Sequence, residues 1–175
     1  MGREVRMIKP GWKHPTYPDT HYPPRLRGEL IPLFEGDFAT DDAEWNEGWA
    51  KWQEGLRESY VPGEKWVPVD PEYRDLRYSD YSGERPSPDD YMPTWAPGEA
   101  TLYVMYENTS EGTPISPPFE TPEELARWLA DNEASAFAGQ TASYEAWLRI
   151  ARGGYAPSAV MSKDGLQSGV EAASK

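Results

Sequence analysis

The feature that most constrains this chain is that aromatic rings stand where aliphatic side chains normally would. Leu, Ile, Val and Phe together make up only 25 of 175 residues, and the net charge is −13. Such a composition ordinarily favours disorder, because too little apolar surface can be buried. Eight Trp and eleven Tyr reverse that expectation, since each ring brings a large apolar area with few rotatable bonds. We therefore expect an ordered fold with an aromatic core.

The length and the charge distribution suggest one domain, residues 1–175, with three parts. Residues 1–32 hold six Lys and Arg against three acids, which predicts a basic, proline-rich, irregular arm. Residues 33–152 form an acidic, aromatic-rich body, and residues 153–175 a C-terminal hairpin or tail. From residue 33 onward eleven bases face twenty-seven acids, so the body should repel nucleic acid and membrane surfaces and attract basic partners.

Several classes of protein are disfavoured by what the sequence lacks. The chain has no Cys, which excludes disulfides, thiolate nucleophiles and sulfur-based zinc sites. It shows neither an apolar signal sequence at its start nor a run of about 18 apolar residues that would cross a membrane. We therefore expect a cytoplasmic protein.

The pattern of Trp residues predicts a first helix at 41–58, capped by Thr40 or Asp41. Its apolar stripe comprises Trp45, Trp49, Trp52 and Leu56. Gly48 and Gly55, seven residues apart beside this stripe, would let a neighbouring element approach closely. We expect the stripe to face the core, and any part that stays exposed would be the leading interaction site.

The remaining elements complete an α+β prediction: a small sheet with three short Trp-bearing helices. The best strand is 101–107, which is apolar enough to be buried on both faces. Capping residues predict helices at 121–132 and 143–152, with Trp128 and Trp147 in the core. The turn Lys163-Asp164-Gly165 predicts a C-terminal β-hairpin.

Two proline-rich segments should lack regular structure. Residues 10–24 form an extended strap, whose Trp12, Tyr17 and Tyr22 either lie against the body, as we expect, or serve a proline-reading partner. Residues 60–97 form a long, mostly irregular excursion rich in Tyr and Pro. Loops of this length are uncommon in compact domains unless they are functional.

The search for catalytic motifs is negative. No Gly-x-Ser-x-Gly elbow, phosphate loop or dinucleotide fingerprint occurs, so we expect neither an enzyme nor a cofactor. Asp19 and His21 offer two metal ligands without a third, so no metal site is expected. A pair of carboxylates acting on a sugar stays open as an alternative, because sequence spacing cannot test their separation.

Several stretches carry a resemblance to short uncharacterised proteins encoded by tailed phages and prophages. They are residues 11–15, 91–95, 105–107, 110–117, 121–132 and 134–137, within a similarity that spans roughly residues 11 to 148. The match is specific in the second half and loose in the first. The resemblance implies a phage accessory protein acting in the cytoplasm of a bacterial host, and it transfers no residue roles.

The sequence and this resemblance together predict a non-enzymatic modulator or inhibitor of a bacterial host or defence protein. The partner should be basic or nucleic-acid-handling, and an acidic nucleic-acid mimic is a special case. The alternative is a small hydrolase or carbohydrate-binding module with an aromatic-lined cleft. The candidate partner-binding residues combine acids with rigid rings: Glu47, Glu54, Glu58, Trp66, Tyr73, Tyr78, Tyr81 and Tyr91.

Overall fold

The chain folds into two compact units of α+β structure. The computed structural model describes residues 2–107, 112–137, 139–157, 159–162 and 165–172. Unit 1 comprises residues 1–34 and 93–175, and unit 2 comprises residues 35–92. The expected boundaries at residues 32 and 152 do not coincide with these units, because the N-terminal segment belongs with the C-terminal half. That the whole chain is one domain stays a prediction.

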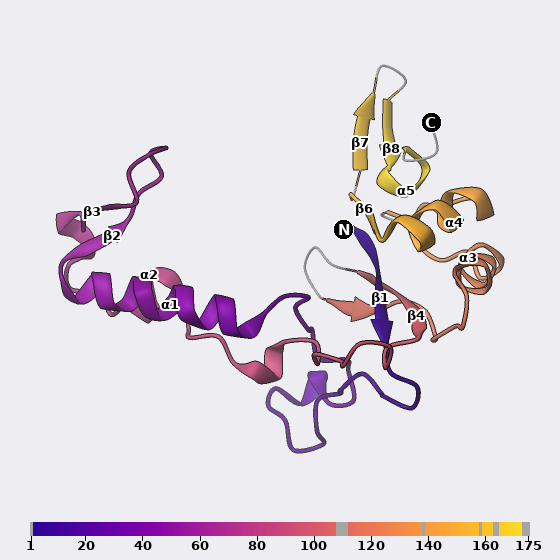
Figure 1. Ribbon diagram of the computed structural model, residues 1–175, viewed down its shortest axis with the longest axis horizontal. Helices are drawn as coiled ribbons and strands as arrows, with labels where there is room; N and C mark the ends of the chain where they lie inside the picture. The colour runs from indigo at the N-terminus through magenta and orange to yellow at the C-terminus, as the bar shows by residue number, and fades with distance from the viewer. Residues whose placement is uncertain (1, 108–111, 138, 158, 163–164, 173–175) are drawn as a thin grey trace. The chain divides into compact units, whose positions relative to one another are not determined.

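Unit 1 is built on an antiparallel sheet with the strand order β5-β4-β1-β6. In β1 and β4, which lie side by side in Figure 1, Arg3 is opposite Glu107 and Ile8 is opposite Leu102. The strand expected at 101–107 is confirmed as β4. The bounds are β1 (Arg3–Ile8), β4 (Leu102–Glu107), β5 (Thr113–Pro114) and β6 (Tyr155–Ala156).

The expectation that residues 1–32 are an irregular arm is wrong for β1, which is an interior strand of the sheet. Its alternating charges do not mark an exposed segment, because they are buried in pairs. The Arg3 guanidinium lies 3.8 Å from the Glu107 carboxylate, and Arg6 pairs with Glu4. All four side chains are buried. A buried charge is tolerated when it is paired and hydrogen-bonded, which composition alone does not reveal.

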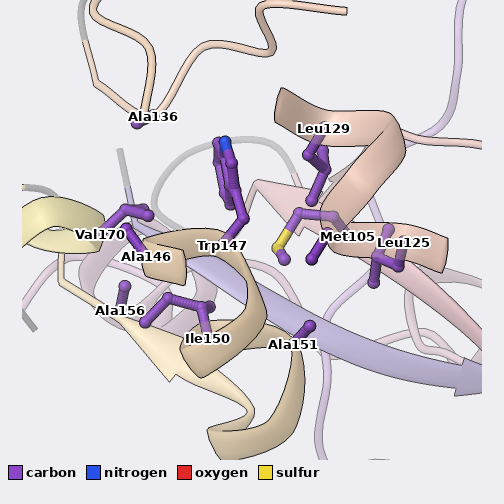
Figure 2. Close-up of a cluster of buried hydrophobic side chains, with 11 residues drawn as sticks. Met105, Leu125, Leu129, Ala136, Ala146, Trp147, Ile150, Ala151, Ala156 and Val170 are labelled. Atoms are coloured by element: carbon purple, nitrogen blue, oxygen red, sulfur yellow. The ribbon is translucent and has the colours of Figure 1, made fainter. Parts of the chain in front are cut away.

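One face of this sheet is covered by α3 (Pro122–Asp131) and α4 (Tyr144–Gly153), which pack against each other. Both helices begin as expected: Thr121 and Glu124 form a capping box, and the Ser143 side chain caps α4. Figure 2 shows Trp147 at the centre of the buried cluster, between Met105 and Leu129 on one side and Ala146 and Val170 on the other.

The opposite face of the sheet is covered by the proline-rich strap and the segment that follows it. The expected packing of the strap rings against the body is confirmed for Trp12, which contacts Trp95, but is wrong for Tyr22, which is exposed; Tyr17 stacks on His21 within the strap. Arg6 donates a hydrogen bond to the Leu33 carbonyl oxygen at 2.7 Å. His14 donates from Nε2 to the Ile31 carbonyl at 2.6 Å, which leaves Nδ1 to accept from the Tyr106 hydroxyl at 3.2 Å. Burial lowers the pKa of His14 and raises that of Tyr106 to about 12. Both rings therefore remain neutral at pH 7.

The C-terminal segment of unit 1 contains β7 (Ala159–Ser162), β8 (Gly165–Ser168) and α5 (Gly169–Ala172). β7 and β8 pair antiparallel, with Ala159 opposite Ser168. The hairpin is therefore confirmed, whereas the turn expected at Lys163 and Asp164 lies outside the described residues.

Unit 2 is organised by α1 (Phe38–Gln53), which the Asp37 side chain caps. The expected bounds of 41–58 and the cap at Thr40 or Asp41 are wrong. The helix stops before Gly55, which has a positive φ of 79°, a conformation that glycine adopts without strain. Leu56 therefore lies in a strand, outside the helical stripe.

The rest of unit 2 is more ordered than the expected irregular excursion at 60–97. A short hairpin pairs Glu58 with Trp66, and 3-10 turns occupy Pro71–Tyr73 and Pro88–Asp90. The other elements are β2 (Leu56–Glu58), β3 (Trp66–Pro68) and α2 (Tyr78–Ser82). In neither unit does any helix of the described residues have the length and apolar character needed to span a membrane.

Candidate functional site

The eight residues predicted to bind a partner all lie in unit 2, but they do not form one surface. Three tyrosines pack inside the unit, two glutamates lie with Trp66 around a lysine, and Glu54 and Tyr91 stand apart at opposite ends of α1. Only part of the predicted set is therefore available to a partner.

Tyr73, Tyr78 and Tyr81 form an aromatic cluster with Trp52. The Tyr81 ring lies 4.6 Å from Trp52, and the Tyr73 ring lies 5.5 Å from Tyr81. Trp52 is buried and donates its indole N–H to the Leu76 carbonyl at 3.2 Å. Burial raises the pKa of Tyr81. These three partly buried tyrosines pack within the unit, and among them Tyr78 also lines a groove beside α1.

Glu47, Glu58 and Trp66 surround Lys65, and we call this surface the Lys65 patch. Lys65 Nζ lies 2.8 Å from the Glu47 carboxylate and 5.3 Å from the centre of the Trp66 ring. The hydrogen bonds that Lys65 donates to Glu47 raise the Lys65 pKa, and the charges of Glu58 and Glu44 add to that effect. Three carboxylates therefore gather around one ammonium group, which leaves the patch negative.

The last two predicted residues have local partners. Glu54 accepts a hydrogen bond from Lys51 at 2.8 Å, at the end of α1. At the start of α1, the Tyr91 hydroxyl donates to Asp41 at 2.7 Å, and its ring lies 5.6 Å from Phe38. Burial, followed by the Asp41 charge, raises the Tyr91 pKa to about 12. These contacts hold the C-terminal end of unit 2 against the start of α1.

A groove of about 610 Å³ opens beside α1, and we call it the Trp49 groove. Trp49 is 47% exposed there. By contrast, the Trp45 and Trp52 indole N–H groups donate hydrogen bonds to the carbonyl oxygens of Gly83 and Leu76, respectively. The described residues that line the groove include no Asp or Glu; they are Trp45, Trp49, Trp52, Gln53, Arg74, Leu76, Arg77, Tyr78 and Ser79.

Of the eight predicted partner-binding residues, only Tyr78 lines the Trp49 groove. The sequence predicts that the Trp stripe faces the core and that any exposed part of it is the leading interaction site, and Trp49 is such an exposed part. The other wall comes from Arg74, Leu76 and Arg77, which are fixed when Trp52 bonds to the Leu76 carbonyl. An exposed Trp in a stripe longer than its neighbouring elements is the signal that could have indicated the groove.

Unit 2 carries most of the negative charge of the chain. Residues 35–92 contain sixteen Asp and Glu against six Lys and Arg, a net −10 of the total −13. Five of the six bases form ion pairs within the unit, at separations of 2.7–2.9 Å. These pairs cancel locally, so an excess of ten negative charges remains to act on a partner.

Among the described residues, Asp19 and His21 belong to no group of three potential metal ligands. The His21 ring packs against Tyr17 with centroids 4.3 Å apart. No group of three or more His, Asp or Glu that could hold a metal ion occurs within the described part of the chain.

Comparisons with protein-family models, curated proteins and solved structures found no match.

Proposed function

We propose that this chain is a non-enzymatic binding protein that uses unit 2 to recognise a basic bacterial protein. The observation that carries the proposal is the net −10 concentrated on 58 residues that also expose Trp49 and Tyr60. Such a charge steers a basic partner and raises the association rate, whereas buried aromatic anchors slow dissociation.

The Trp49 groove suits an apolar side chain of that partner. Its indole wall supplies apolar area, and tryptophan is enriched among residues that dominate binding energy. Arg74 offers guanidinium donors that fit backbone carbonyl oxygens, whereas Arg77 is already paired with Asp80. The Lys65 patch would lie towards the rim of the interface, where charge mainly sets salt dependence.

The resemblance to phage accessory proteins supports a bacterial target and an inhibitory role in the host cytoplasm. A nucleic-acid-handling enzyme suits this role, because its basic surface is complementary to unit 2. Nucleic-acid mimicry is a narrower form of the same proposal. We rank it lower because the five ion pairs break the acids into separate groups.

The test uses the full chain as bait in bacterial lysate, followed by kinetics with the purified captured protein. Two variants probe unit 2: a charge variant changing Glu44, Glu58 and Glu64 to Gln, and the anchor variant Trp49→Ala. We expect the charge variant to slow association and weaken its salt dependence, and Trp49→Ala to speed dissociation at least tenfold, equivalent to about 1.4 kcal/mol.

Matched controls come from unit 1. One control changes Asp19 to Asn and Glu29 and Glu145 to Gln, which removes the same charge at exposed positions. Tyr22→Ala removes an exposed ring that is 84% accessible. Equal loss of binding in control and unit 2 variants, or failure to retain any basic protein, would contradict the proposal.

The Trp49 groove also favours a second candidate, a carbohydrate-binding module. An exposed indole beside Gln53 and Ser79 offers a stacking face and hydrogen-bonding groups for a sugar ring. The test is a titration with neutral oligosaccharides that follows the Trp49 indole N–H signal by NMR. Saturable shifts of this signal and of the Gln53 and Ser79 amide signals, with the amide shifts lost in Trp49→Ala, would support this candidate, and unchanged spectra would dismiss it.

A further inference from the structure

A second groove lies in unit 1, along α3 and the start of α4, and has a volume of about 480 Å³. It differs from the Trp49 groove because carboxylates line it together with the aromatic rings. The lining residues are Phe119, Glu123, Glu124, Arg127, Trp128, Asp131, Asn132 and Tyr144.

The aromatic rings of this groove can receive a cation. Phe119 and Trp128 lie with their ring centroids 6.2 Å apart, and Tyr144 contributes from α4. The Arg127 guanidinium already lies 3.9 Å from the centre of the Tyr144 ring. The groove thus holds a guanidinium of its own chain on one ring, which shows that its shape and electrostatics accept this group.

Two carboxylates flank Trp128 on the same face of α3, at positions i−4 and i+3. Glu124 is partly committed, because it accepts the Thr121 backbone N–H in the capping box. Asp131 has no ion pair or side-chain hydrogen bond within the described residues. Arg127 stands four positions before Asp131, where an ion pair is normally favourable, but stacks on Tyr144 instead. Asp131 therefore presents an uncommitted charge beside the indole.

We propose that this groove binds an arginine side chain of the partner protein, with the guanidinium over Trp128 and paired to Asp131. Glu123 is paired with Arg152, so Glu124 and Asp131 against Arg127 leave the lining with a net charge of −1, which favours a cation over an anion. Arginine suits the site better than lysine, because its planar guanidinium stacks on an indole while its edge donates to a carboxylate. The inference deepens the proposed function, on which it rests for the existence of a basic protein partner.

The test titrates the full chain with the peptide acetyl-Gly-Arg-Gly-amide and, as a neutral isostere, with the same peptide carrying citrulline. Binding is followed by NMR at the Trp128 indole N–H, which is assigned with Trp128→Phe. We expect saturable shifts at Trp128 and Asp131 with the arginine peptide only. Asp131→Asn should weaken binding about tenfold, because a charge-assisted pair becomes neutral. Glu145→Gln, which changes an exposed acid on α4 outside the groove, should leave binding unchanged.

Several results would overturn the inference. They are equal binding of the citrulline peptide, unchanged affinity in Asp131→Asn, shifts confined to unit 2, or no saturable shift at all. Equal binding of a lysine peptide would overturn the assignment to arginine. The peptide is a defined probe of the groove in unit 1, whereas none of the variants in the lysate experiment changes a residue that lines this groove. This inference and the proposed function can therefore fail separately.

Discussion

Gly48 is the residue on which the packing of unit 2 depends most directly. A Cβ placed there would lie 2.0 Å from the Tyr78 hydroxyl oxygen. The Tyr78 ring cannot easily retreat, because it is held 5.2 Å from Trp45 and 5.8 Å from Trp52. The sequence predicted a close approach at Gly48 and Gly55. The structure confirms it at Gly48, with Tyr78 as the neighbour, whereas nothing lies within 4 Å of Gly55.

We therefore expect Gly48→Ala to destabilise the protein although alanine is the better helix former. Overpacking costs about 1–3 kcal/mol, which exceeds the gain of about 1 kcal/mol in helix propensity. Urea unfolding measures the change. The matched control is Gly153→Ala in α4, where nothing lies within 4 Å, and it should be neutral or stabilising. Equal stability of Gly48→Ala and the native chain would show that Tyr78 does not pack on this glycine.

At the scale of elements, α3 and α4 contribute their tryptophans unequally to the core. Trp147 is fully buried, whereas Trp128 is only partly buried at the edge of the cluster. The sequence predicted equal roles, because both helices share one spacing: a large apolar residue, two further positions, and then Trp-Leu. The pattern identifies the apolar face of a helix, but the position of each helix over the sheet decides how deeply that face is covered.

We expect Trp147→Ala to cost about 3–5 kcal/mol, the range for deleting a fully buried aromatic ring, and Trp128→Ala to cost clearly less. Chemical denaturation of the two variants, compared at the same temperature, provides the measurement. Trp95→Ala, which removes another partly buried ring of unit 1, serves as the reference for a peripheral position. A Trp128→Ala variant as unstable as Trp147→Ala would contradict this ranking.

The elements that the sequence predicted best are those with local signals. The capping box at Thr121 and Glu124 defined α3, and Ser143 and Gly154 defined α4. By contrast, β1 was missed because Arg3 and Arg6 give it a polar appearance. Their charges are neutralised by Glu107, which is distant in sequence, and by Glu4. A strand stabilised by long-range ion pairs cannot be identified from local hydropathy.

At the scale of the whole molecule, charge is divided unevenly between the two units. Unit 2 carries −10 and unit 1 the remaining −3. The sequence located the acidic excess only in a body of residues 33–152, because the units are not continuous in the chain. That the named acids and tyrosines bind a partner stays a prediction, and their grouping in space could not be predicted, since contacts such as Lys65 with Glu47 bring together residues 18 positions apart.

Two opposing effects act on the charge of unit 2, and salt distinguishes them. Its five ion pairs are accessible to solvent, and such pairs contribute little to stability. The uncompensated acids repel one another, which destabilises the compact state. Raising NaCl from about 0.01 M to about 0.3 M shortens the Debye length from roughly 30 Å to below about 10 Å. Screening should then relieve the repulsion more than it weakens the pairs.

We therefore expect amide protons of α1 in unit 2 to become more protected from hydrogen exchange as salt rises, and those of α3 and α4 in unit 1 to respond much less. Residue-resolved exchange by NMR measures both sets in one sample. The variant with Glu44, Glu58 and Glu64 changed to Gln should show a weaker salt response in α1, because part of the excess charge is gone. Protection of α1 that falls with salt would instead mean that the ion pairs dominate, and that the negative charge of unit 2 imposes no cost on its folding.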